Sequence, residues 1–511
     1  MKNQVFNPYL PLDVYIPDGE PHVFGDRVYV FGSHDKEGGN TFCMLDYEVW
    51  SAPVDDLSDW HCEGVIYRAE QDPDRDEKRK YMYAPDVVRG NDGRYYLYYA
   101  LAGGCFTSPI HVAVCDTPAG KYEYYGSLRN PDGSVFDRKI TFDPGLINDG
   151  GTIRLYYGWA MGSAKMNDLP PEMAETVKQQ LRPIEMQMFG KTAEQLDAEP
   201  DGIQGAFTVT LDDDMLTVTS EPIRILPGQL DAAGTQFEGH AFFEASSIRK
   251  IGDTYCFIYS SQVNHELCCA TSQYPDKDFR YGGVLISNGD IGYKGRKAKD
   301  RLAITGNNHG SIENIGGEWY IFYHRHTNKT CYSRQGCAEK ITINPDGTIP
   351  QVEMTSCGLN PAPLLPQGSY PAVIACNLTN GKMPHIEQDG VKDDIPCITC
   401  RNGERIIADI CDGTLIGYKY FQFDGGARLT LCVKGNGKGR FIVKAGDEKI
   451  GSAAVRPSDT WWETGTDLCV QGVKALFLIY EGEGKADLKS LSFQKTLAEG
   501  VHHVDHPYHM R

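Results

Sequence analysis

A glycine-containing turn followed by a strand of aromatic and aliphatic residues occurs five times in the first two thirds of the chain. The copies begin at Gly25, Gly93, Gly151, Gly252 and Gly316. Repeats of about sixty residues, each long enough for several strands, are typical of propeller blades, which are four-stranded sheets arranged around a central axis. The repeats therefore predict an all-β fold that begins with a five-bladed β-propeller over residues 1–355. A β-sandwich or a solenoid with coincidental turns stays open at this point.

The repeat spacing widens once, between the third and fourth copies. That gap contains a helical stretch, Pro170–Phe189, with prolines at its start and charged residues on one side. We expect a helical insertion at about residues 165–200. After the repeats, the proline-rich residues 356–369 predict an extended linker. Short alternating strands then resume over residues 370–495 and predict a β-sandwich domain, followed by a polar, His-bearing tail at 496–511.

The charge balance limits the partners of the chain. With 50 Lys and Arg against 69 Asp and Glu, the net charge is −19. This surplus argues against nucleic acid and against anionic membrane surfaces, which both attract basic proteins. Prolines interrupt the first twenty residues, so we expect no signal peptide. Many of the 16 cysteines lie in apolar, strand-like runs, where free thiols behave as small hydrophobes, and we therefore expect a cytoplasmic protein. The oligomeric state stays open.

Each repeat also carries one polar residue seven or eight positions before its glycine turn. These residues are Asp18, Asp86, Asp143, Glu244 and His309. Equivalent positions in radially arranged blades form a ring around one end of the axis. Any one of these acids alone is ordinary in a turn. A ring of carboxylates is costly, because like charges held together raise each other's pKa, and the shared register therefore indicates function.

Glycoside hydrolysis is a reaction that needs such a group of acids. One protonated carboxyl protonates the leaving oxygen, while an ionised carboxylate activates water or attacks the sugar. Four of the ring residues lie in short motifs, which are Pro17-Asp18, Ala84-Pro85-Asp86, Asp143-Pro144 and Phe243-Glu244-Ala245, and a further motif, Asn7-Pro8, precedes them. Together with the five-bladed layout, these motifs resemble glycoside hydrolase family 43 over about residues 5–350. Members of that family include β-xylosidases, α-L-arabinofuranosidases and arabinanases.

The resemblance implies a role for each residue. Because the family inverts the anomeric centre, Asp18 would be the general base that activates water. Glu244 would be the general acid, and Asp143 would modulate the pKa of that acid and orient it. Glu238, in Glu238-Gly239, is a rival for the acid, although it lies fourteen residues before Gly252 and Glu244 lies eight before it.

The resemblance also implies binding residues around the axis. Asp86 would line the wall of the substrate pocket, and His309 would hold an ordered water or a central ion, often calcium. Arg325, just after the fifth strand, would contact a carboxylate or a sugar hydroxyl. The reaction itself would require no cofactor. At Gly19, Tyr83 and Ser246 the chain departs from the residues that are usual in the family motifs. These departures bear on the substrate subsite more than on the mechanism.

The C-terminal segment is similar to family 6 carbohydrate-binding modules, in which exposed aromatic rings stack on sugars. Trp461 or Trp462 would be such a platform; the alternative is that one Trp packs in the core and the domain braces the propeller. We expect an inverting, exo-acting β-xylosidase and/or α-L-arabinofuranosidase that acts on short plant-type oligosaccharides. A sugar-binding propeller without activity, or another specificity such as galactosidase, stays open.

Overall fold

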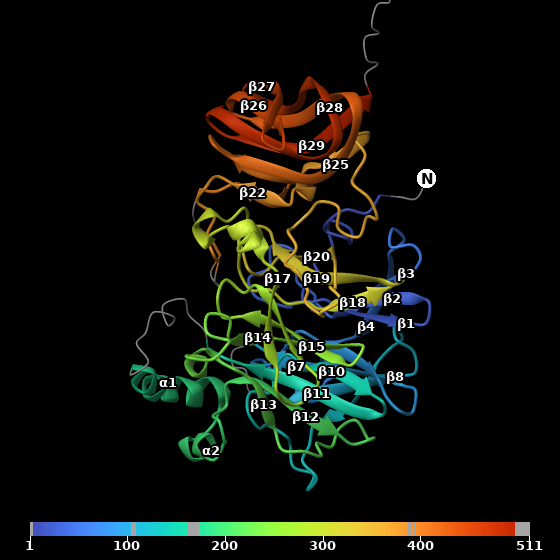
Figure 1. Ribbon diagram of the computed structural model, residues 1–511, viewed down its shortest axis with the longest axis vertical. Helices are drawn as coiled ribbons and strands as arrows, with labels where there is room; N and C mark the ends of the chain where they lie inside the picture. Colours follow the sequence, from blue (N-terminus) through green and yellow to red (C-terminus); the bar gives the residue numbers. More distant parts are fainter. Residues whose placement is uncertain (1–3, 104–108, 162–172, 387–389, 392–393, 496–511) are drawn as a thin grey trace, which may run out of the picture.

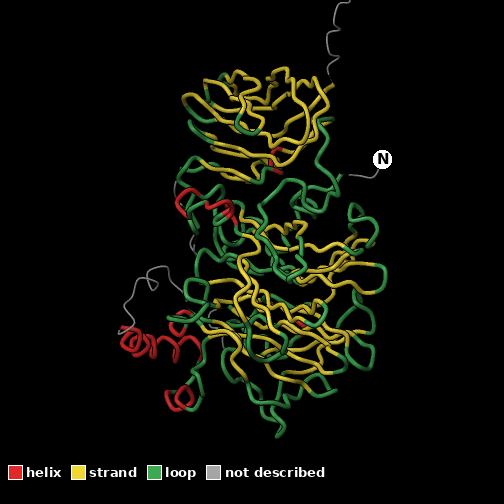
Figure 2. Tube along the Cα trace, viewed as in Figure 1, coloured by secondary structure: helices red, strands yellow, loops and turns green. Residues whose placement is uncertain are grey.

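The structure is a computed structural model that describes residues 4–103, 109–161, 173–386, 390–391 and 394–495. Strands make up most of its regular structure, and two short helices are grouped at one side of the larger domain (Figure 2). No helix in these ranges is long and apolar enough to cross a membrane. The predicted tail and the first part of the predicted insertion lie outside the described residues.

Five antiparallel sheets follow one another along the chain and confirm the five-bladed propeller (Figure 1). The first contains β1 (Glu20–Phe24), β2 (Arg27–Phe31), β3 (Tyr47–Pro53) and β4 (His61–Tyr67). The second contains β5 (Tyr81–Met82), β6 (Asp86–Arg89), β7 (Tyr95–Ala102), β8 (Ile110–Cys115) and β9 (Glu123–Ser127). The third contains β10 (Gly145–Asp149), β11 (Thr152–Trp159), β12 (Gly205–Leu211) and β13 (Ile223–Pro227). The fourth contains β14 (Phe242–Ile251), β15 (Thr254–Ser261), β16 (Leu267–Ser272) and β17 (Arg280–Ile286). The fifth contains β18 (Ile312–Ile315), β19 (Glu318–His326) and β20 (Arg334–Ile341).

Each predicted glycine turn joins a blade's strand nearest the axis to the next strand outward. Gly25 between β1 and β2 and Gly252 between β14 and β15 have φ values of 67° and 61°, which favour glycine. The strands before these turns contact one another: β1 touches β6 and β18, and β10 touches β6 and β14. These strands therefore surround the axis.

The N-terminal segment closes the ring of blades by packing on the fifth sheet. The side-chain amide of Asn7 donates to the carbonyl of Ala338 and accepts from its amide, both at 3.0 Å. The amide of Tyr9 donates to the carbonyl of Gly336 at 3.3 Å. The start of the chain thus covers the edge strand β20, which would otherwise expose unpaired backbone groups.

The predicted insertion contains helices α1 (Ala174–Phe189) and α2 (Ala193–Asp197) between β11 and β12. Phe189, the last residue of α1, contacts the ring of Trp159 at 5.6 Å between centroids. Leu196 of α2 joins the same buried cluster. The insertion therefore braces the end of β11.

The C-terminal strands form one sheet that folds over itself as a sandwich (Figure 1). They are β21 (Gly368–Pro371), β22 (Asn377–Thr379), β23 (Cys397–Arg401), β24 (Glu404–Ile410), β25 (Leu415–Gly435), β26 (Lys438–Ala445), β27 (Glu448–Val455), β28 (Ser458–Glu483) and β29 (Ala486–Lys495). The long strands β25 and β28 pair along most of their length, and their apolar side chains fill a single core with those of β29. The predicted sandwich domain is therefore present.

The two domains pack closely against each other. Leu364, in the predicted extended linker, is buried in the sandwich core, and Leu359 is buried in the propeller. Lys419 of β25 places its Nζ atom 2.9 Å from Asp290 and 2.8 Å from Glu353. The linker is therefore anchored on both sides, because its leucines gain more from burial than from exposure.

Candidate active site

The five ring residues predicted from the repeats lie at the starts of the five strands around the axis. Asp18 and Asp143 come two residues before β1 and β10, Asp86 is the first residue of β6, Glu244 is the third residue of β14, and His309 comes three residues before β18. The blades therefore bring them to the same end of the axis.

The backbone at this end of the axis is strained at three positions. Asp18, Asp143 and Ala245 have φ values of 57°, 47° and 68°, in the left-handed region that L-residues seldom adopt. The pairing of β14 with β15 also shifts register on both sides of Glu244. Backbone strain and β-bulges of this kind are common at functional sites, where they orient a side chain.

Asp18 is held as a carboxylate. It is 4% exposed, and its Oδ1 lies 2.8 Å from Nη1 of Arg334 and 3.3 Å from Nδ1 of His324. Burial alone would raise the pKa of Asp18, but Arg334, followed by His324, outweighs burial and lowers that pKa far below its usual value. Asp18 is therefore ionised at neutral pH.

At Asp143 and Glu244, unlike at Asp18, the effect of burial on the pKa is not outweighed by a cation. Asp143 is 4% exposed, and its Oδ2 accepts a hydrogen bond from the amide of Ala245 at 2.9 Å. Burial, and then the charge of Asp18, raise the pKa of the half-buried Glu244 to about 8. Burial and the neighbouring Glu244 raise the pKa of Asp143 well above its usual value. The cluster thus combines one ionised carboxylate with carboxyls that keep their protons, as an acid–base pair requires.

The rival acid Glu238 lies outside this cluster. It is exposed, and its carboxylate accepts a hydrogen bond from the amide of Gly234 at 2.9 Å within the same turn. The geometry therefore favours Glu244 as the proton donor.

Aromatic side chains surround the carboxylates. The ring of Tyr83 contacts Phe42 and Phe142, at 6.2 and 5.8 Å between centroids. Trp159, whose side chain hydrogen-bonds to Glu244, contacts Phe243 at 5.6 Å. Flat apolar surfaces next to carboxylates suit the faces of sugar rings.

The comparisons with known proteins agree with this geometry. The model of glycosyl hydrolases family 43 matches residues 12–201. A protein of Thermoclostridium stercorarium named xylosidase/arabinosidase is 45% identical over 515 residues, which cover 96% of this chain and 99% of that protein. The chain belongs to glycosyl hydrolases family 43. As a member of this family it is a glycosidase.

Other relatives of this family 43 enzyme are more distant. A Bacteroides ovatus xylosidase/arabinosidase is 27% identical over 330 residues, covering 62% of this chain and 87% of that protein. The crystal structure of a family 43 enzyme from Xanthomonas citri superposes with a TM-score of 0.51 at 22% identity, covering 70% of this chain and 96% of that one. The propeller fold is therefore shared.

Asp86 of this family 43 enzyme lies deeper than the pocket wall expected for it. It is fully buried, its Oδ1 lies 2.6 Å from Nε2 of His22, and its Oδ2 accepts from the amide of Leu146 at 2.7 Å. Asp86 does not line an open pocket wall, because its carboxylate is engaged by His22 of the first blade and Leu146 of the third. Asp86 therefore holds blades together inside the axis.

His309 lies between the catalytic cluster and the deeper acids. Its Nδ1 is 3.6 Å from Oδ2 of Asp143, and its Nε2 is 3.9 Å from Oε1 of Glu20. Burial lowers the pKa of His309 to about 4, so the imidazole is neutral at pH 7. Neither Nε2 of His309 nor Oε1 of Glu20 has a hydrogen-bond partner within the described residues. The two atoms therefore fit a small polar group between them.

Arg325 was predicted to contact the substrate, but it lies on the opposite face of β19. Its guanidinium donates to Gln335 Oε1 and to the carbonyls of Val373 and Ala375, near the 3₁₀ turn Ala372–Ile374 of the C-terminal domain. Side chains alternate along a strand, so the neighbours of Arg325 face the site instead. His324, on the other face, contacts Asp18. The alternation in Tyr323-His324-Arg325-His326 separates His324 from Arg325 but does not show which face points to the axis.

Arg334 was also missed, because its role depends on two contacts across the ring closure. It is the first residue of β20, and it pairs with Asp18 and with Asp35, which lie about 300 positions earlier in the chain. No local pattern in β20, which also carries Gln335, Glu339 and Lys340, distinguished this arginine.

The tryptophans of the C-terminal domain are engaged within that domain. The indole nitrogen of Trp461 donates to Glu404 at 2.7 Å, and Nζ of Lys489 lies 5.7 Å from its ring centroid. Trp462 packs against the sandwich core, with Arg456 4.9 Å from its ring centroid. These contacts favour the bracing role over a sugar-stacking platform.

The position of Arg325 gives a first prediction. In Arg325→Met, three buried acceptors lose their donor, and each unsatisfied group costs about 1–3 kcal/mol. We expect the free energy of unfolding to fall by about 3 kcal/mol, while kcat/KM of the folded enzyme changes by less than about twofold. Urea unfolding and glycosidase kinetics measure the two effects.

Arg440→Met is the matched control, because Arg440 makes an exposed ion pair with Glu481 on the sandwich. It should change the free energy of unfolding by no more than about 0.5 kcal/mol. An Arg325→Met enzyme of normal stability that has lost about 100-fold in kcat/KM would instead place Arg325 at the substrate.

Proposed function

We propose that the chain is an inverting, exo-acting β-xylosidase and/or α-L-arabinofuranosidase that acts on short plant-type oligosaccharides. Asp18 is the general base, Glu244 the general acid and Asp143 the modulator of the acid. The observation that carries this proposal is that two neighbouring carboxyls have pKa values shifted in opposite directions. The pKa of Asp18 is lowered, and the pKa of Glu244 is raised.

The reaction follows from these protonation states. The Glu244 carboxyl donates its proton to the glycosidic oxygen as the bond from that oxygen to the anomeric carbon breaks. The Asp18 carboxylate takes a proton from a water, whose oxygen bonds to the anomeric carbon from the opposite face. The two products leave, and solvent returns a proton to Glu244 and removes one from Asp18.

Asp143 supports the acid through its backbone and its charge. By accepting from the amide of Ala245, it fixes the residue that follows Glu244. Its carboxyl also interacts directly with that of Glu244, so the two acids oppose each other's ionisation. Both effects keep Glu244 oriented and protonated when the substrate arrives.

The relatives and the site both support the proposed substrate class. Two relatives carry the name xylosidase/arabinosidase, one of them at 45% identity along nearly the whole chain. The rings of Phe42 and Tyr83, which are partly exposed, offer stacking surfaces for neutral sugars. We further propose a cytoplasmic enzyme, supported by free thiols buried in its strands, such as Cys256 and Cys268. Such an enzyme meets short imported chains, which suits exo-action.

Between His309 and Glu20 we propose an ordered water or a hydrated calcium ion. The two facing atoms supply one nitrogen and one oxygen, whereas Ca²⁺ takes 6–8 oxygen ligands, so an ion there would keep most of its water. When bound, it would add positive charge next to the deeper acids. His309 and Glu20 would hold it, and the proton transfers above would not pass through it.

The role of Glu244 gives a second prediction, measured on a panel of aryl xylosides, arabinofuranosides and galactosides together with xylobiose. The wild-type enzyme should cleave the xylosides or the arabinofuranosides. Glu244→Gln should fold normally and lose about 10²–10⁴-fold in kcat/KM on xylobiose, because the leaving sugar no longer receives a proton. The loss should be much smaller for an aryl leaving group that departs without a proton.

Glu238→Gln is the matched control, since it removes a carboxyl only six residues away. It should keep the wild-type kcat/KM on every substrate. Full activity in Glu244→Gln together with inactivity in Glu238→Gln would make Glu238 the general acid. A wild-type enzyme that is inactive on the whole panel would refute the proposed substrate class.

A third prediction concerns pH. Glu244 must be protonated, so kcat/KM should fall at alkaline pH with an apparent pKa of about 8. Asp18 must be ionised, and its lowered pKa should preserve activity below the usual carboxyl range. Arg334→Met removes a charge that lowers both pKa values, so both limbs of the profile should move to higher pH.

The pH profile is measured with xylobiose, because its leaving sugar needs the proton of Glu244, and circular dichroism checks that the variant is folded. Arg334→Lys keeps a cation and should shift the acidic limb less than Arg334→Met does. An acidic limb that stays in place in a folded Arg334→Met enzyme would show that Asp18 is not the base.

A further inference from the structure

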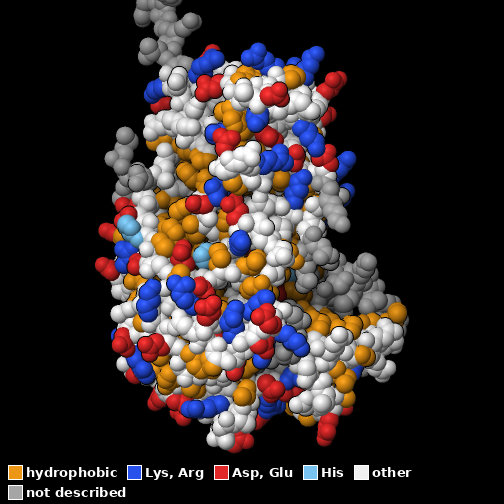
Figure 3. Space-filling model, turned by 180° about the vertical axis from the view of Figure 1, so that it is seen from behind, with side chains coloured by type: hydrophobic (Ala, Val, Ile, Leu, Met, Phe, Trp, Pro, Cys, Tyr) orange, Lys and Arg blue, Asp and Glu red, His pale blue; other side chains and the backbone are white. Residues whose placement is uncertain are grey.

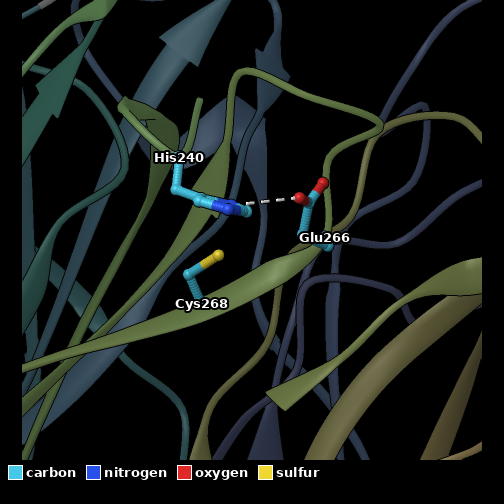
Figure 4. Close-up of side chains that lie close together, drawn as sticks. All are labelled: His240, Glu266 and Cys268. Atoms are coloured by element: carbon cyan, nitrogen blue, oxygen red, sulfur yellow. Dashed lines mark ion pairs between the residues drawn. The ribbon is translucent and has the colours of Figure 1, made fainter. Parts of the chain in front are cut away.

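A second group of chemically reactive side chains lies in the fourth blade, apart from the carboxylates of the active site. His240 lies two residues before β14, Glu266 directly precedes β16, and Cys268 is the second residue of β16 (Figure 4). One possible ligand atom from each residue lies within 4.8 Å of the other two. The three side chains converge on a common point, as Figure 4 shows.

Two atoms of this group are buried without a partner. The Nδ1 atom of His240 lies 3.5 Å from Oε1 of Glu266. Neither that nitrogen nor Oε2 of Glu266 makes a hydrogen bond within the described residues. Glu266 is only 6% exposed, so its second oxygen has little access to water. A buried carboxylate oxygen and a buried imidazole nitrogen without partners are costly unless something binds them.

The surrounding structure holds the group in place. The backbone of His240 is fixed on both sides, since its amide donates to Phe237 and its carbonyl accepts from the hydroxyl of Tyr259 at 2.7 Å. The ring of Tyr281 stacks on His240 at 4.6 Å and 14°. Glu266 and Cys268 are two positions apart at the start of one strand, so their side chains point to the same face. The three side chains are therefore preorganised.

We propose that His240, Glu266 and Cys268 bind one Zn²⁺ or a similar first-row transition-metal ion. Nitrogen, oxygen and sulfur ligands together suit zinc, whereas Ca²⁺ and Mg²⁺ prefer oxygen alone. Three protein ligands leave the fourth tetrahedral position to water. On binding, the Cys268 sulfur loses its proton to solvent and bonds to the metal, and no oxidation state changes.

Two other groups of this kind in the described residues are less suitable. The Asp72, Asp74 and His111 group is already joined by a 2.8 Å pair between His111 and Asp72, and Asp72 also accepts from Tyr99. The Glu20, His22 and Asp86 group belongs to the axis described above. Neither contains a thiol. The His240 group is therefore the one whose ligand types best match a zinc-type ion.

Such a metal would tie together the segments that present the general acid. His240 lies four residues before Glu244, and Glu266 follows His265, whose ring contacts Phe243 at 4.5 Å. The bound ion would thus join the start of β14 to the start of β16, stabilising the native state rather than entering the reaction.

Metal titrations of the reduced, chelator-treated full chain test the proposal. The background carries Cys62→Ser and Cys469→Ser, because these two thiols are exposed. One equivalent of Co²⁺ should bind and produce a cobalt–thiolate charge-transfer band. Zn²⁺ should displace the Co²⁺ and raise the Tm of the protein. His240→Ala and Glu266→Gln should each weaken binding at least about 10-fold. Cys268→Ala should remove the band.

Cys432→Ala is the matched control, since this thiol lies on β25 of the other domain, and it should keep the band and the affinity. Because all variants share one background, any contribution from metal bound by the tail histidines is the same in each of them. A missing band, a band that survives Cys268→Ala, or binding of equal strength in His240→Ala would each overturn the proposal. If Cys268→Ala fails to fold, metal binding by His240→Ala still tests the proposal, because His240 is only half-buried.

Discussion

The ion pair of Arg334 with Asp18 and Asp35 is the interaction on which the rest of the structure depends. Arg334 begins the last propeller strand, while both carboxylates belong to the first blade, so the fork of 2.8–3.0 Å contacts joins the two ends of the ring. All three groups are almost completely buried. Removing one partner of such a network costs about 3–5 kcal/mol, because the remaining charges stay buried without compensation.

The same guanidinium determines the chemistry of the site. It keeps Asp18 ionised, and the charge of Asp18 then helps to keep Glu244 protonated. Ring closure and the separation of the two protonation states are therefore one electrostatic arrangement. His309 separates this cluster from the deeper acids Glu20 and Asp86, where burial, followed by the charge of Asp86, raises the pKa of Glu20 to about 8.

The propeller could be predicted from the sequence because its signals are local. A glycine turn and the strand after it lie within ten residues, and five copies show the blade number. The ring residues followed from their distance to those turns. Arg334 could not be found in this way, since its contacts with Asp18 and Asp35 span about 300 residues. The face of β19 that points to the site could not be predicted either, because strand alternation shows which residues share a face but not which face points inward.

The depth of Asp86 shows another limit of register arguments. Its distance to the glycine turn equals that of Asp18, yet contacts with His22 and Leu146 of the neighbouring blades bury its carboxylate completely. The linker shows a third limit, because proline spacing indicates an extended chain but not that Leu364 enters the sandwich core. Both outcomes depend on tertiary packing.

The central claim is that Asp18 activates a water while Glu244 protonates the leaving group from the other side of the sugar. The anomeric configuration of the first product, followed by proton NMR during cleavage of an aryl β-xyloside, or of an aryl α-L-arabinofuranoside if the enzyme prefers it, tests this claim most directly. We predict that the anomer opposite to the substrate appears first and then mutarotates. Initial release of the same anomer as in the substrate would make Asp18 a nucleophile and would contradict the account.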